Sequence, residues 1–192
     1  MKKSICIYFQ IHHPARLRKY QFFDIGKKHN YFDNYANRSE LEDLAEHCYL
    51  PANALLLELI KKHEGKFKVA FSITGSAIDQ LEMHTPEVIR SFQELAATGN
   101  VEFLAETYSH SLASLSEDTD EFEQQVKRHS NAIKQLFGKK PVTFRNTSLI
   151  YSDKIGERVA KLGFKTMLTD GAKHVLGWKS PNFVYKNALD EN

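Results

Sequence analysis

Polar and aromatic side chains follow each of five short β-rich runs in this chain of 192 residues. They are His12 and His13 after the first run, Thr74 and Ser76 after the second, Glu106 and His110 after the third, Arg145, Asn146 and Ser148 after the fourth, and Asp170 and Trp178 after the fifth. Carboxylates and imidazoles can transfer protons, guanidinium groups bind oxygen acceptors, and tryptophan offers a large flat apolar face. Because the carboxyl ends of parallel strands meet on one rim of a sheet, we expect these side chains to form one site.

Some of these side chains also have purely structural interpretations. His12 and His13 could simply hydrogen-bond neighbouring loops. Glu106 directly follows an apolar strand, so we expect it at the rim of the sheet, with Arg145 or a histidine as its partner. His110 lies four residues after Glu106, but no helix is predicted there, so we give this spacing no weight.

Two further residues of the set have open alternatives. Arg145 and Asp170 either serve the site or form a structural ion pair across neighbouring strand ends. Trp178, the one tryptophan of the chain, either fills the core or provides a stacking platform for a sugar. The sequence does not choose between these interpretations.

Metal and nucleotide cofactors are disfavoured by the motifs. A zinc or iron site would need three ligands, such as His12, His110 and either Glu106 or Asp170. No closely spaced ligand pair such as His-Glu-x-x-His occurs, and no GxGxxG, Walker A or GxSxG motif is present. Thr74-Gly75-Ser76 is only a weak anion-binding signal. We therefore expect no metal and no cofactor.

Composition and charge argue against several classes of protein. Lys plus Arg is 26 and Asp plus Glu is 24, and no long basic tract exists, so nucleic acid is not an expected partner. No segment approaches about 18 apolar residues, and residues 1–13 lack the long apolar region of a signal peptide. We expect no membrane association and a cytoplasmic location. Cys6 and Cys48 lie in apolar patterns that predict buried free thiols.

The elements that position the candidate residues alternate between strands and helices. The expected strands are Ser4–Gln10, Lys68–Ile73, Val101–Ala105, Val142–Phe144 and Thr166–Leu168. The first is a nearly continuous apolar run, which is typical of a strand buried on both faces. This alternation predicts a parallel sheet with right-handed crossovers. No linker divides the chain, so residues 1–192 are expected to form a single α/β domain.

Helix start and stop signals lie between the expected strands. Ser39 and Glu42 form a capping box before one helix, and Pro51 suits the first turn of the next, which Gly65 ends. Three more helices are expected: one from Thr85-Pro86 to Gly99, one with apolar positions from Phe122 to Leu136 that stops at Gly138, and one from Ser152 to Gly163.

The rim segments, taken in chain order, resemble known motifs. They are Gln10-Ile11-His12-His13-Pro14, Ser72-Ile73-Thr74-Gly75-Ser76 with Gln80-Leu81-Glu82, the segment Glu102–Ser111, the segment Phe144–Tyr151, Asp170-Gly171, and Leu176–Asn182. Together they resemble glycoside hydrolase family 57 in its α-amylase-like branch, over nearly the whole chain. The first motif of that family is usually His-Gln-Pro, and His13 stands at its Gln.

This resemblance implies a fold and an activity. The fold would be the N-terminal portion of an incomplete (β/α)7 barrel of the glycoside hydrolase/deacetylase type. The activity would be retaining cleavage or transfer of α-glucosidic bonds by two carboxyl groups about 5–5.5 Å apart. A barrel of this kind has about 250 residues or more, so we expect the chain to be truncated at its C-terminal end.

The sequence departs from the family pattern at the expected nucleophile. The third motif of the family reads Arg-Asn-Thr-Glu, with Glu as the nucleophile, and this chain has Ser148 there. A neutral hydroxyl cannot stabilise an oxocarbenium-like transition state as a carboxylate does, and no evident base is available to activate it. The acid/base Asp of the family belongs to a later motif that these 192 residues do not reach.

Four hypotheses for the function follow. The first is an α-glucan hydrolase or transferase with impaired catalysis, and the second is an inactive homologue that binds or senses an α-glucan or oligosaccharide. The third is a structural fragment with an incomplete site. The fourth is a metal-dependent polysaccharide deacetylase, whose motif His-Ser-x-x-His is only half present at His110-Ser111, with Gln10 and His12 in place of the expected aspartates.

Overall fold

The computed structural model describes residues 5–189, and its centre is a set of five parallel strands. They are β1 (Tyr8–Ile11), β2 (Val69–Ile73), β3 (Val101–Phe103), β4 (Thr143–Arg145) and β5 (Thr166–Leu168). The first three pair in the order β1-β2-β3, and β4 pairs with β5. Ala105 joins the two groups through a parallel bridge to Phe144. The predicted parallel sheet is therefore confirmed.

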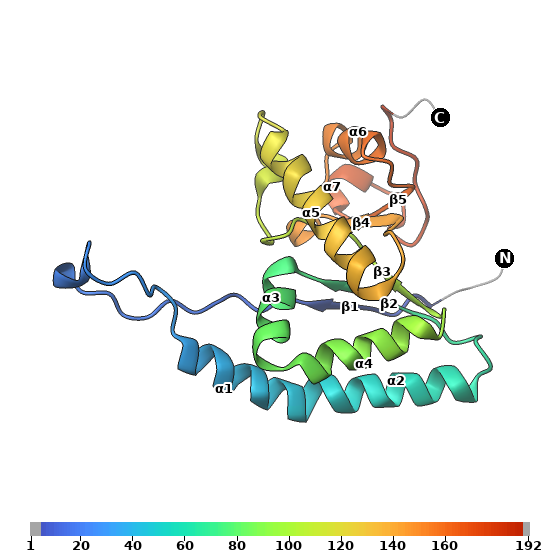
Figure 1. The fold of residues 1–192 in the computed structure, drawn as a ribbon. Helices are drawn as coiled ribbons and strands as arrows, with labels where there is room; N and C mark the ends of the chain where they lie inside the picture. The colour runs from blue at the N-terminus through green and yellow to red at the C-terminus, as the bar shows by residue number, and fades with distance from the viewer. Residues whose placement is uncertain (1–4, 190–192) are drawn as a thin grey trace.

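Helices follow each strand and cover the sheet (Figure 1). They are α1 (Asn34–Leu44), α2 (Leu50–Lys62), α3 (Gly75–His84), α4 (Pro86–Ala97), α5 (Asp120–Phe137), α6 (Asp153–Lys161) and α7 (Lys173–Leu176). A π-helical turn, Ala45–Tyr49, connects α1 to α2 without a break. Pro51 has no backbone N–H to donate to the preceding turn, which accounts for the irregular turn just before it.

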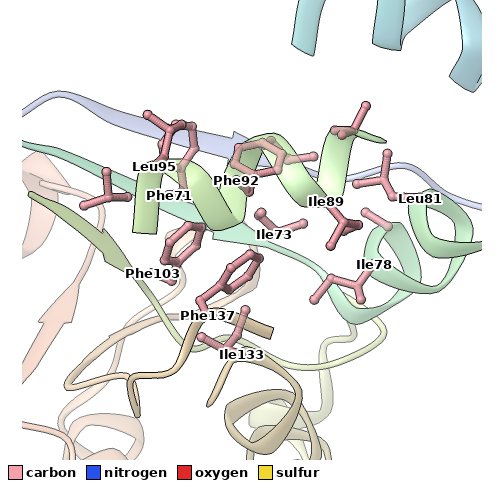
Figure 2. Close-up of a cluster of buried hydrophobic side chains, with 14 of the residues drawn as sticks. Phe71, Ile73, Ile78, Leu81, Ile89, Phe92, Leu95, Phe103, Ile133 and Phe137 are labelled. Carbon is pink, nitrogen blue, oxygen red and sulfur yellow. The ribbon is translucent and has the colours of Figure 1, made fainter. Parts of the chain in front are cut away.

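Two apolar clusters hold the strands in place. In the first, shown in Figure 2, the rings of Phe71 and Phe103 stack at 5.9 Å, and Phe137 of α5 stacks on Phe103 at 4.0 Å. The second surrounds Phe144 of β4, which contacts Phe122 of α5 edge-on at 5.8 Å. Helix α5 contributes to both clusters, so it connects the two groups of strands.

An arm formed by residues 16–32 lies between β1 and α1. Figure 1 shows it extending away from the strands and helices. Leu17 and Phe32 form an antiparallel bridge at its base, and the Arg18 amide donates to the Tyr31 carbonyl at 3.0 Å. The arm is thus held by its own contacts, not by the apolar core.

Several sequence predictions about these elements were wrong. Helix α1 begins at Asn34, because the Asp33 side chain accepts from the Ala36 amide at 3.0 Å, so Ser39 lies inside the helix. Helix α3 was not predicted at all. It begins at Gly75 directly after β2, and Thr74 caps it by accepting from an amide in its first turn.

Strand β1 and the cysteines also differ from expectation. The strand starts at Tyr8, and of its four residues only Ile11 is buried, because β1 lies at the edge of the sheet. Ser4, where the predicted run starts, lies outside the described residues. Cys6 and Cys48 are free thiols but exposed, not buried. Cys6 precedes the edge strand, and Cys48 lies on the solvent side of the π-helical turn.

Between residues 5 and 189, no helix combines the length and the apolar character that crossing a bilayer requires.

Candidate functional site

Glu106 is the most deeply buried ionisable residue at the carboxyl ends of the strands. Its side chain has no exposed surface. Its Oε2 lies 3.2 Å from His110 Nδ1 and 3.7 Å from Arg145 Nη1. A buried carboxylate is costly unless a cation compensates it, so these two contacts explain how Glu106 is tolerated here. The sequence predicted Arg145 or a histidine as the partner of Glu106, and the structure confirms both kinds of partner.

The contact between Glu106 and His110 corrects the interpretation of their spacing. The intervening segment is not a helix, yet the two side chains meet. His110 has a left-handed backbone with a φ of 54°, which turns the chain back toward Glu106. Residues other than glycine rarely adopt this conformation, and such strain concentrates at functional sites. The four-residue spacing therefore does matter, for a reason that helical periodicity could not reveal.

His12 packs against His110 on the outer side of this pair. The two rings stack with their centroids 4.2 Å apart, and His12 Nδ1 lies 3.0 Å from Thr74 Oγ1. Burial, and then the nearby His110, lower the pKa of His12 below its ordinary value. Part of the His110 side chain, 19%, remains exposed, whereas Glu106 beneath it is covered. A ligand at this rim would meet the two imidazoles first.

Arg145 connects the cluster to the edge strand. Its Nη2 donates to Gln10 Oε1 at 2.7 Å, so a side chain from β4 meets one from β1. Three buried polar atoms of the cluster have no hydrogen-bond partner, namely Arg145 Nε and Nη1 and Glu106 Oε1. Buried polar groups are nearly always paired, and unpaired ones are characteristic of functional sites. We refer to Gln10, His12, Glu106, His110 and Arg145 as the strand-end cluster.

His129, which the sequence analysis treated only as part of a helix face, supports the cluster from below. Its side chain is fully buried on α5. His129 Nε2 donates to the Ile73 carbonyl at 2.8 Å, and Nδ1 accepts from the Glu106 amide at 3.3 Å. Burial lowers the pKa of His129. Its only signal in the sequence was a histidine among the apolar positions of α5.

Tyr108 lies in the segment after β3 that the sequence analysis singled out, but it was not among the predicted site residues. Its hydroxyl donates to Asp79 Oδ1 at 2.6 Å, and the Arg128 guanidinium lies over its ring at 3.7 Å from the centroid. Burial and the hydrogen bond to Asp79 raise the pKa of Tyr108 to about 12. The ring packs directly against Gly75, at the start of α3. It thereby fixes the loop between Glu106 and His110 against α3.

The loop after β4 presents Ser148 at the surface. Asn146 is fully buried, and its Nδ2 donates to Ser114 Oγ and to the Ile150 carbonyl, both at 2.9 Å. Ser148 and Leu149 are both left-handed, with φ values of 54° and 57°. Ser148 itself is exposed, and within residues 5–189 its hydroxyl has no hydrogen-bond partner. The loop is thus firmly held, but its serine is not activated by a neighbouring base.

The remaining candidates lie apart from the cluster. His13 is buried, and its Nε2 lies 4.0 Å from Glu40 Oε2. Asp170 is exposed and, among the described residues, forms no ion pair with Arg145, so that structural alternative is wrong. The Asp170 amide donates to the Leu149 carbonyl at 3.1 Å, so the segment after β5 lies next to the loop that carries Ser148. Trp178 is 93% exposed, so the core-filling interpretation is also wrong.

Nowhere in residues 5–189 do three or more His, Cys, Asp or Glu side chains converge as a metal ion would require. The strand-end cluster instead offers imidazole, amide and guanidinium groups, which can form hydrogen bonds with hydroxyl groups.

The parallel strands, the covering helices and the polar residues at the strand ends define a protein of the β/α-barrel type. The sequence pattern of Glycosyl hydrolase family 57 matches residues 6–190, and the chain belongs to this family. It is 41% identical over 184 residues to a protein of Methanocaldococcus jannaschii named "Putative alpha-amylase". The alignment covers 93% of this chain and 38% of that protein, so the chain spans less than half the length of this curated relative.

Solved structures of other proteins show the same fold. The 4-alpha-glucanotransferase from Thermococcus litoralis superposes with a TM-score of 0.63 at 13% identity, over 86% of this chain and 22% of that one. The alpha-amylase AmyC from Thermotoga maritima gives 0.60 at 14% identity, over 87% of this chain and 39% of that one. The predicted fold class, part of a β/α barrel of the glycoside hydrolase type, is confirmed.

Proposed function

We propose that this chain binds α-glucans or related oligosaccharides at the strand-end cluster and hydrolyses them poorly or not at all. The family supports the substrate class, as do the names of its relatives, an alpha-amylase and a 4-alpha-glucanotransferase. The observation that carries the proposal is the strand-end cluster of polar side chains in a chain that has a serine at the position of the family's nucleophile.

The rim has the chemistry of a sugar-binding surface. The partly exposed imidazole of His110 stacks on His12, and Glu106, itself paired with Arg145, holds His110 in place. Each imidazole uses its Nδ1 within the protein, which leaves Nε2 of each ring and an apolar ring face for a sugar, and these contacts already fix the two rotamers. Preorganised groups lose little side-chain entropy on binding.

Impaired catalysis follows from the surroundings of Ser148. Its neutral hydroxyl contacts no base among the described residues, so it lacks the activation that a serine nucleophile needs. Glu106 supplies the carboxyl group of the strand-end cluster, but His110 covers it and its side chain is fully buried. It cannot reach an anomeric carbon without displacing His110.

The test compares the wild-type chain with Ser148→Glu, and Ser148→Gln serves as a control of matched size without a charge. Calorimetric titration with maltoheptaose measures binding. Hydrolysis is measured with an α-maltosyl fluoride, because its leaving group needs no acid to protonate it and so isolates the contribution of the nucleophile. We expect all three proteins to bind maltoheptaose, but only Ser148→Glu to release fluoride or to form a covalent glycosyl adduct detectable by mass spectrometry.

The outcomes separate the two parts of the proposal. Efficient fluoride release by the wild type would overturn impaired catalysis, and absence of maltoheptaose binding would overturn the binding role.

Trp178→Ala tests the stacking platform in the same titration. If the sugar extends to Trp178 and stacks on it, the loss of the ring should weaken binding. Because the side chain is 93% exposed, the thermal midpoint of unfolding should not change. The matched control is Tyr35→Ala, an exposed aromatic residue on α1.

A further inference from the structure

Strands β2 and β3 separate at their carboxyl ends, next to the strand-end cluster. The Leu104 amide donates to the Phe71 carbonyl at 2.7 Å, as in a regular parallel pair. The next hydrogen bond in this register would join the Glu106 amide to the Ile73 carbonyl. These two groups do not bond to each other. Each bonds instead to a different nitrogen of His129.

The imidazole of His129 therefore bridges the two strands where their direct hydrogen bond is missing. Nε2 must carry the proton, because it faces the Ile73 carbonyl at 2.8 Å. Nδ1 must be unprotonated, because it faces the Glu106 N–H at 3.3 Å. A protonated ring would place two N–H groups against each other, so only the neutral ring fits. We call this arrangement of Ile73, His129 and Glu106 the imidazole bridge.

The separation of the strands has a consequence for Glu106. Beyond Phe103 the chain leaves β2, and Ala105 pairs with β4 instead, through its amide to the Thr143 carbonyl at 2.9 Å. Glu106 is the next residue, and the imidazole bridge satisfies its amide at this turning point. The position of its backbone sets where its carboxylate meets His110 and Arg145.

We propose that His129 is a positioning residue for the sugar-binding rim: through the imidazole bridge it holds β2 and β3 apart and fixes Glu106, which in turn anchors His110. This inference rests on the proposed function for the role of the rim in binding. His129 contacts neither the exposed rim nor any candidate ligand position, so it acts only through Glu106. Without the bridge, the Glu106 amide and the Ile73 carbonyl are each left unpaired, or they pair directly and shift Glu106 toward β2.

The variants are chosen to separate bridging from packing. In His129→Gln, the amide oxygen can accept from the Glu106 N–H and the amide nitrogen can donate to the Ile73 carbonyl, so the bridge is retained. In His129→Leu, the volume is kept but the bridge is lost. The control is Ile133→Ala, one turn further along α5, which removes apolar packing from the cluster in Figure 2 without touching the bridge.

Two readouts are measured on each protein. The first is the affinity for maltoheptaose, for which we expect a loss of about tenfold or more in His129→Leu, corresponding to one lost anchoring interaction. The second is the set of ¹H–¹⁵N ring resonances of His110, which report its contact with Glu106 with no sugar present. Both should stay close to wild type in His129→Gln and Ile133→Ala.

The inference is overturned if His129→Leu folds and leaves the His110 resonances unchanged, or if Ile133→Ala moves them equally. If His129→Leu does not fold, the wild type decides: a two-bond nitrogen–nitrogen coupling between His129 Nδ1 and the Glu106 amide must be present, and its absence rejects the bridge. If the wild type binds no maltoheptaose, the proposed function fails, but the His110 resonances still test the role of His129.

Discussion

At the scale of single residues, the strand-end cluster depends on how a buried carboxylate is compensated. Glu106 has no exposed surface, and Arg145 is 5% exposed, with two of its nitrogens lacking hydrogen bonds. Such a pair contributes little net stability relative to an apolar pair, but removing one partner leaves an uncompensated buried charge. The two residues should therefore tolerate joint replacement better than replacement of Arg145 alone.

This argument predicts the effect of Arg145→Met. The variant should lower the free energy of unfolding by about 3–5 kcal/mol, because it leaves Glu106 with only His110 as a partner. The double variant Glu106→Gln with Arg145→Met should recover part of this loss. Urea denaturation measures both values. Arg38→Met is the control, because its exposed pair with Glu42 should contribute less than about 1 kcal/mol.

The sequence could predict part of this residue-level picture. Glu106 follows an apolar strand, and that placement required a cationic partner, which the structure supplies. His129 could not be recognised in advance. Its role depends on β2 and β3 separating at one point, and a histidine among the apolar positions of α5 has the same pattern whether or not it bridges two strands.

At the scale of elements, the tightest contact in the site lies between α3 and the loop after β3. A β-carbon on Gly75 would lie 2.4 Å from ring atoms of Tyr108, which is too close for any side chain. Gly75 allows the first turn of α3 to approach the loop, and the Tyr108 hydroxyl secures the same contact by its bond to Asp79. The glycine is therefore required for space rather than for a special φ value.

Gly75→Ala should accordingly destabilise the protein by about 1–3 kcal/mol, through overpacking against Tyr108. Combining it with Tyr108→Ala should remove this penalty, because the clashing ring is then absent. Thermal or urea unfolding of the two single variants and the double variant gives the coupling energy. A coupling energy of zero would show that the two elements can move apart without cost.

The same contact explains why α3 escaped prediction. A glycine directly after a strand normally indicates a turn, and the sequence analysis gave Thr74-Gly75-Ser76 only as a weak anion-binding signal, with no helix after it. Elements whose limits are set by local chemistry were predicted well: β5 spans Thr166–Leu168 as expected, and α5 ends before Gly138, which has a left-handed φ of 79°. The start of α3 has a local signal as well, the Thr74 cap, but the space for its first turn depends on packing against Tyr108, a residue more than 30 positions away.

At the scale of the whole molecule, the buried histidine makes folding depend on pH. Burial depresses the pKa of His129 in the folded state below its ordinary value of 6.5. The unfolded chain therefore binds a proton at this site more readily than the folded chain does, and stability rises with pH where that difference exists. The contribution of the neutral His129 ring to the free energy of unfolding is complete above about pH 6.5 and is lost as the pH falls below that value.

We expect the free energy of unfolding to decrease as the pH falls from 7 to 5. His129→Gln should have a shallower pH dependence than the wild type, because glutamine keeps the hydrogen bonds but does not titrate. Urea titrations at several pH values measure the two slopes. His12 and His13 also have pKa values lowered chiefly by burial, so the variant should retain a residual slope in the same direction. Equal slopes for both proteins would mean that His129 accepts a proton without disrupting the bridge.

The two outermost strands differ from β2 in a way that hydrogen exchange can measure. β2 is paired on both sides, and four of its five residues are buried, whereas β1 and β5 each pair on one side among the described residues. We propose that in a complete barrel of this family further strands would cover these edges. In the isolated chain, amides of β1 and β5 should exchange many times faster than those of β2, because edge hydrogen bonds open without unfolding the core. Equal protection of β1 and β2 would contradict free edges, and a rise in β1 protection with protein concentration would show that a second copy pairs with that edge.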